Sequence, residues 1–173
     1  HIYLQNPSDF GVDINKVEVG LGSRPDEESM EESRETFENS LSEFRKFNRE
    51  LLTDEQKETY DIYSYQSELN EKLNDEKFDY YPSLFESMAG IHYQLPTMLA
   101  DWDLRSEQDV KDLIVMVKDT QPYVSAALNY TKKQEEKGLL MLDLQSVIDY
   151  CSGILEQGEY SSILTSMYEN IDA

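Results

Sequence analysis

The chain has 173 residues, which suits one globular domain, and 36 acidic against 15 basic residues give it a net charge of −21. This acidic excess argues against nucleic acid as a partner, because phosphate contacts need lysine and arginine, and it disfavours docking on anionic lipid. The hydrophobic fraction of 39% can build a core, yet no run reaches the roughly 18–20 apolar residues of a membrane span. The charge either solubilises the surface or offers an acidic patch to a basic partner.

The first 51 residues predict a mostly irregular segment followed by a long helix. Asn6 to Asp9 has turn chemistry, and Gly20, Gly22 and Pro25 mark a loop. Apolar residues at steps of three, four and seven then predict a helix over 26–51, with this stripe: Met30, Phe37, Leu41, Phe44, Phe47 and Leu51.

A second helix is predicted over 54–75, because Thr53 and Gln56 fit a capping box. Its apolar candidates are Tyr60, Ile62, Tyr63, Leu69 and Leu73. Since the turn between the two helices is short, we expect them to pack as an antiparallel pair.

Residues 75–105 predict an irregular segment with a short helix or turn near 83–88 and a short helix over 96–102. Aromatic residues are densest here: Phe78, Tyr80, Tyr81, Phe85, Tyr93 and Trp102. Such a segment is either a packed connector or a contact surface. Tyr80, Tyr81 and Trp102 likewise either pack in a core or form a stacking platform for a ligand.

The longest helix is predicted over 106–137, with Ser106 as its cap and Gly138 after its end. Pro122 predicts a kink or a break within it. Its apolar stripe is Val110, Leu113, Ile114, Val117, Val124 and Leu128. Two further helices are expected over 143–156 and 159–170, divided by Gly158.

These elements predict an all-α fold, an antiparallel bundle of about five to seven helices in a single domain over 1–173. The segment 75–105 forms the irregular aromatic connector within that domain. Cys151 lies on an apolar helical face, which favours a small packed residue over a reactive thiol.

Candidate chemistry is sparse because the chain holds only two histidines, His1 and His92, and one cysteine. A zinc site needs three or four ligands at short spacings, which His92 cannot supply alone. We therefore expect His92 to be hydrogen-bonded in the structure or to line a contact surface. Asp101 and Asp103, which flank Trp102, are the candidate catalytic carboxylates. A catalytic carboxyl pair, however, needs one member in an apolar pocket.

Several phrases together resemble the amino-terminal region of the bacterial domain-of-unknown-function family numbered 885. His1-Ile2-Tyr3-Leu4-Gln5-Asn6-Pro7 and Val19-Gly20-Leu21-Gly22 are similar to its opening. Leu52 to Ile62 resembles its capped second helix, and Gly90 to Pro96, continuing to Leu99-Ala100, is the strongest match. The ending Glu169 to Ala173 is similar too, so the resemblance spans nearly the whole chain.

The resemblance implies that the parent is a zinc metallopeptidase of the gluzincin kind. The family's metal motif resembles His-Glu-Gly-x-Pro-Gly-His, lies in its carboxy-terminal half and does not occur in this chain. We therefore expect no cofactor, catalytic residue or metal ligand here, with zinc only in the missing carboxy-terminal part. The family also implies a surface lipoprotein outside the cell.

The leading hypothesis is a non-catalytic amino-terminal region of such a peptidase, which walls or covers the substrate cleft. Its partners would be the remainder of its own polypeptide and a peptide substrate, with these contact residues: Tyr80, Tyr81, His92, Tyr93 and Trp102. A start at His1 rather than Met suggests a processed or trimmed product. The alternatives are a free-standing acidic binding module and a purely structural interaction bundle.

Overall fold

The computed structural model describes residues 11–13, 16–140, 143–161, 164–166 and 168–169, and within these ranges the chain is all-α and contains no strand, as predicted. It divides into two compact units. We call Pro25–Pro82 the hairpin unit, and His1–Arg24 together with Ser83–Ala173 the core unit. The single domain and the bundle arrangement stay predictions.

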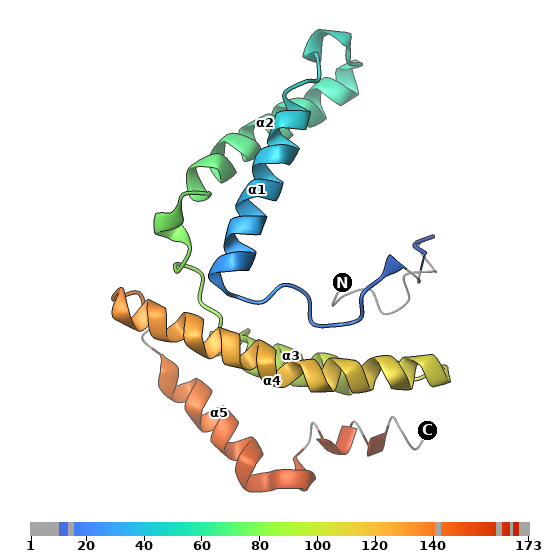
Figure 1. Ribbon diagram of the computed structural model, residues 1–173, viewed down its shortest axis with the longest axis vertical. Coiled ribbons are helices and arrows are strands. Elements are labelled where there is room, and N and C mark those ends of the chain that lie inside the picture. Colours follow the sequence, from blue (N-terminus) through green and yellow to red (C-terminus); the bar gives the residue numbers. More distant parts are fainter. Residues whose placement is uncertain (1–10, 14–15, 141–142, 162–163, 167, 170–173) are drawn as a thin grey trace. The chain divides into compact units, whose positions relative to one another are not determined.

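The hairpin unit consists of α1 (Glu27–Phe44), α2 (Asp54–Leu73) and two short 3₁₀ helices, η3 (Arg49–Leu51) and η4 (Glu76–Phe78). The predicted capping box at Thr53 is confirmed. The rings of Phe44 and Tyr60 stack with centroids 4.7 Å apart near the turn. At the other end, Arg34 donates to Asp79 at 2.6 Å. These contacts make α1 and α2 an antiparallel pair (Figure 1).

The first helix ends at Phe44, whereas the apolar spacing predicted that it would continue to Leu51. Asn48 caps the following 3₁₀ helix with its side chain, and Arg49 donates twice to Asp61 of α2, both times at 2.6 Å. These local bonds offer the backbone an alternative to the helix. The end of the predicted stripe is therefore exposed, with Leu51 at 83%.

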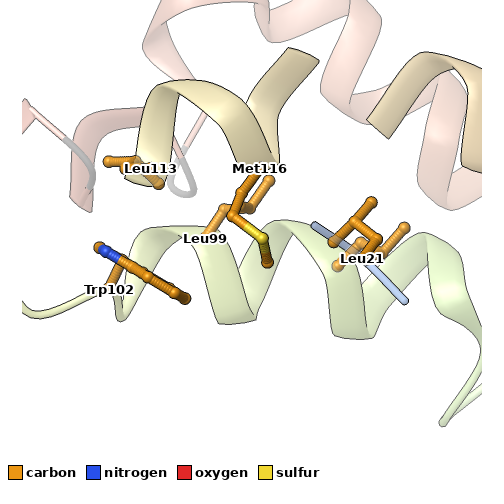
Figure 2. Close-up of a cluster of buried hydrophobic side chains, with 6 residues drawn as sticks. Leu21, Leu99, Trp102, Leu113 and Met116 are labelled. Atoms are coloured by element: carbon orange, nitrogen blue, oxygen red, sulfur yellow. The ribbon is translucent and has the colours of Figure 1, made fainter. Parts of the chain in front are cut away.

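The core unit contains α3 (Ile91–Ala100), α4 (Glu107–Glu136), α5 (Leu144–Gln157) and the 3₁₀ helix η5 (Gly158–Tyr160). Its hydrophobic core lies between α3 and α4, which run side by side (Figure 1). Figure 2 shows Met116 of α4 beside Leu99 of α3 and beside Leu21, which belongs to the segment before α1. The buried cluster is Leu21, Leu95, Leu99, Trp102, Leu113 and Met116.

Helix α3 begins at Ile91, not near residue 96 as predicted, and the stretch 83–88 forms turns rather than a helix. Pro96 lies inside α3, where it removes one backbone donor. Burial outweighs that loss because Leu95 and Leu99 both enter the core. Residues 91–100 of the segment predicted as an irregular connector thus form a regular helix.

Helix α4 buries a face that overlaps the predicted stripe only in part. The predicted members Val110, Ile114, Val117 and Leu128 are 43–50% exposed. Leu113 of the stripe is buried as predicted, Val124 packs against the core, and three further buried residues each precede an exposed member: Asp109, Met116 and Ala127. Successive residues lie about 100° apart on a helix, so both faces carry a helical apolar pattern. Packing against α3 selects the face that holds Met116.

Asp109 can occupy this buried face because its polar atoms are bonded. Its carboxylate accepts from the backbone N–H of Arg105 at 3.0 Å and from the Ser106 hydroxyl at 2.8 Å. Its backbone carbonyl accepts from the Trp102 indole N–H at 3.2 Å. Ser106 also caps α4, as predicted. A buried carboxylate with this many donors costs little.

Helix α4 is continuous through Pro122, so the predicted break does not occur. Proline costs a helix interior about 3 kcal/mol. Residues on both sides of Pro122 are buried, Met116 before it and Ala127 and Tyr130 after it, and this burial offsets the cost. The predicted end is confirmed: Gly138 has a φ of +70°, and the N–H of Leu139 donates to the carbonyl of Gln134 at 2.8 Å.

Helix α5 matches its prediction within a residue. The helix predicted over 159–170 lies partly outside the described residues; 158–160 form η5, and 164–166 are helical. The turn predicted at Asn6 to Asp9 lies wholly outside them.

Asp119 of α4 ties the segment before α1 to the core. Its carboxylate accepts from the backbone N–H of Leu21 at 2.9 Å and from the Arg24 guanidinium at 3.0 Å. Leu21 is 1% exposed, so its N–H has no access to water. The Asp119 carboxylate therefore holds Leu21 in its place in the buried cluster.

We expect Asp119→Ala to lower the free energy of unfolding of the core unit by about 1–3 kcal/mol, because a buried N–H loses its acceptor. Trp102, the only tryptophan and buried in that unit, reports its unfolding by fluorescence in a denaturant titration. Asp112→Ala on the same helix removes only an exposed bond to Gln108 and should change little. Equal loss in both variants would contradict the role of Asp119.

Candidate functional site

A cavity of about 360 Å³ lies in the core unit, bounded by α3, α4, α5 and residues that follow α5. Helix α3 supplies Ile91, His92 and Leu95, while α4 supplies Val117, Thr120 and Val124. The α4 residues follow at steps of three and four, and on α3 Leu95 lies four residues after Ile91 and three after His92, so each set lies on one side of its helix. The cavity therefore follows from the packing of α3 against α4.

The wall of this cavity is almost entirely apolar, because its polar groups are already bonded or covered. The Thr120 hydroxyl donates to the carbonyl of Met116 at 3.2 Å. Opposite, Ser161 is 1% exposed, and its hydroxyl accepts from the backbone N–H of Leu164 at 3.5 Å. Ile154 of α5 adds a further apolar side chain.

His92 forms part of the wall, and both of its ring nitrogens are buried. No group in the described residues forms a hydrogen bond with either nitrogen, so the predicted hydrogen-bonded role is wrong for this part of the chain. The ring lies among other aromatic rings instead: Tyr150 meets it edge-on at 5.3 Å, and Phe85 lies 6.3 Å away. Burial lowers the pKa of His92 from its ordinary 6.5, because a charged imidazole loses its hydration there.

Helix α5 places Tyr150 beside His92, and Cys151 follows Tyr150 in the same helix. The ring of Tyr150 also lies 5.8 Å from the ring of Tyr93. Burial raises the pKa of the Tyr150 hydroxyl, with a smaller contribution from Tyr93. Burial also raises the pKa of the half-buried Cys151 thiol, which agrees with a packed residue and disfavours a reactive thiolate.

Gly90 allows the backbone before α3 to approach closely enough to set His92 in place. A Cβ at this position would lie 2.6 Å from the backbone nitrogen and 2.8 Å from the carbonyl oxygen of Glu86. It would also lie 2.7 Å from Nδ1 of His92. Only glycine fits this contact without a shift of the backbone.

The aromatic residues predicted to make contacts fall into different environments. Tyr80 and Trp102 are 7% and 8% exposed, which supports core packing rather than a stacking platform. Tyr81 and Tyr93 are exposed, and His92 is half-buried. Tyr80 and Tyr81 belong to the hairpin unit, whereas the other three belong to the core unit.

Asp101 and Asp103 are exposed, so no apolar pocket of the kind that a catalytic carboxyl pair needs surrounds them. In the described ranges, no three His, Cys, Asp or Glu residues stand where they could share a metal ion. Nor does any helix there have the length and apolar character to span a membrane.

Sequence reasoning selected His92 and Tyr93 but missed Tyr150, Thr120 and Ile154. The one available signal was the shared apolar face of Ile154 and Cys151 within the predicted helix 143–156. Which helix that face would meet depends on contacts between residues far apart in the chain, and no local spacing reports them.

We expect Gly90→Ala to destabilise the core unit by about 1–3 kcal/mol, because the new Cβ overlaps the backbone of Glu86. Gly153→Ala is the control: its Cβ meets nothing within 4 Å inside α5, and alanine should stabilise that helix by up to about 1 kcal/mol. Denaturant titrations followed by Trp102 fluorescence compare the two. Opposite signs are expected, and a neutral Gly90→Ala would refute the close approach.

We expect His92→Phe to raise the free energy of unfolding by about 1–2 kcal/mol, since it removes two buried polar atoms without partners. The folded pKa lies below the unfolded value of 6.5, so the unfolded chain binds a proton more readily as the pH falls below 6.5. The free energy of unfolding of the wild type therefore falls as the pH drops from 6.5 toward the folded pKa. The difference in this free energy between His92→Phe and wild type should widen over the same range.

Tyr93→Phe serves as the control, because Tyr93 is exposed and phenylalanine keeps its ring. Denaturant titrations between pH 7.5 and about 5, followed by Trp102 fluorescence, measure the difference in the free energy of unfolding between each variant and wild type. A constant difference between His92→Phe and wild type over that range would contradict a buried neutral imidazole.

Comparison with known proteins adds no assignment to this geometry: no protein-family model, curated protein or solved structure matches the chain.

Proposed function

We propose that this chain is a non-catalytic helical region of a larger zinc-dependent peptidase, in which it walls or covers the substrate cleft. Two facts support the proposal. The ordered phrases from His1 to Ala173 resemble the amino-terminal region of such proteins. The helices also expose apolar faces that suit contact with further polypeptide.

The clearest of these faces is on α2, and it carries the proposal. Ile62, Tyr65, Leu69 and Leu73 follow each other at steps of three, four and four residues, which places them on one side of the helix. They are between 41% and 64% exposed. We call them the α2 stripe. Burying one such side chain contributes about 1.5–3 kcal/mol, so a partner surface would be held strongly here.

A free-standing acidic binding module is the alternative. It would need no polypeptide beyond this domain, and the α2 stripe would then bind a separate partner. The coding sequence distinguishes the two. The peptidase region requires several hundred further codons that include the His-Glu-Gly-x-Pro-Gly-His motif, whereas the module does not.

We expect the coding sequence to continue past Ala173 into that motif, and zinc to support peptide hydrolysis by the complete product but not by this chain alone. Leu69→Glu combined with Leu73→Glu should lower the melting temperature and the activity of the complete product. In the isolated chain the same pair should leave the melting temperature unchanged, because both side chains are already exposed.

Gln66→Glu with Asn70→Glu is the matched control, with equal charge and spacing at exposed positions beside the α2 stripe. It should leave the complete product unchanged. A coding sequence that ends near Ala173, or peptide hydrolysis by the isolated chain, would overturn the proposal.

A further inference from the structure

We propose that the cavity bounded by α3, α4 and α5 is a binding site for a small, uncharged, apolar molecule about the size of two fused aromatic rings. This inference goes beyond the proposed function and does not depend on it. It rests on the volume of the cavity, the chemistry of its wall and the state of its few polar groups.

The wall offers a ligand almost no hydrogen-bonding atom. The nitrogens of His92 are covered, and the hydroxyls of Thr120 and Ser161 are engaged with backbone groups. A water molecule needs two to four polar partners to occupy a cavity stably. This cavity is partly open to solvent, and water against its apolar wall finds few protein partners, so an apolar occupant releases that water and gains dispersion contacts.

The volume sets the size of the occupant. About 360 Å³ is near the lower end of the range for ligand cavities, which begins at roughly 300 Å³. A cavity of about 150 Å³ lined by aliphatic and aromatic side chains binds benzene in another protein. Twice that space suits a two-ring compound, and the branched side chains around it, such as Val117 and Ile154, pack well against a flat ring.

Charge excludes the anionic members of this class. Among the described residues, no Lys or Arg lines the cavity, and burial disfavours the protonated form of His92. The chain as a whole carries a net charge of −21. A carboxylate placed here would lose its hydration and gain no cation, so the ligand is neutral.

The test uses the complete 173-residue chain and the neutral two-ring probe 1-aminonaphthalene, whose emission shifts to shorter wavelength in apolar sites. We expect binding in the micromolar range, displaced by 1-methylnaphthalene and at least about tenfold less well by 1-naphthoate. Thr120→Phe and Ile154→Phe fill the cavity from different helices. Each should weaken binding of the probe by about tenfold or more.

Ile114→Phe is the matched control, since it adds the same ring to an exposed position of α4 outside the cavity. It should leave the dissociation constant within about twofold of wild type. Helical circular dichroism and Trp102 fluorescence check that each variant folds. Unchanged binding in the folded variants that fill the cavity, or no binding by wild type, would overturn the proposal.

Hydrogen exchange of the wild-type chain keeps the test decisive if both variants fail to fold. With 1-methylnaphthalene bound, amides of α3 and the middle of α4 should exchange more slowly. Protection confined to α2 would place the probe on the exposed α2 stripe and would refute the cavity as its site.

Discussion

The packing of α3 against α4 is the contact on which the core unit depends. Met116, at 2% exposed, lies beside Leu99 and Leu21, and Trp102 closes the same cluster (Figure 2). Asp119 holds Leu21 in place through its backbone N–H. Because these contacts join three stretches of chain, loss of any one should weaken the others. The cavity beside them exists only while α3 and α4 stay together.

This packing carries local costs that burial offsets. Pro96 and Pro122 each remove a backbone donor inside a helix, and His92 is buried without a hydrogen-bond partner in the described residues. Gly90 admits a backbone approach that any side chain would block. Unfavourable local features of this kind persist where the surrounding contacts require them. Three of the four lie on α3 or directly before it, and two of these, His92 and Pro96, line the cavity.

The surface combines a strongly acidic composition with helical faces that stay apolar. The α2 stripe and the exposed face of α4 at Val110, Ile114 and Leu128 both have the spacing of core-facing helix residues. A surface made only for solubility would not repeat that pattern twice. These exposed faces support the proposed contact with further polypeptide, and the proposed ligand site in the cavity of the core unit does not depend on them.

The sequence by itself determined the all-α class, the limits of α4, the capping box at Thr53 and the helix end at Gly138, because these depend on neighbours within a few residues. The tertiary structure alone decided which face of α4 is buried, since its two adjacent faces both carry a helical apolar pattern. It also decided that α3 begins at Ile91 despite Pro96. The cavity could not be predicted from the sequence for the same reason: its walls come from three helices whose mutual contacts leave no local pattern.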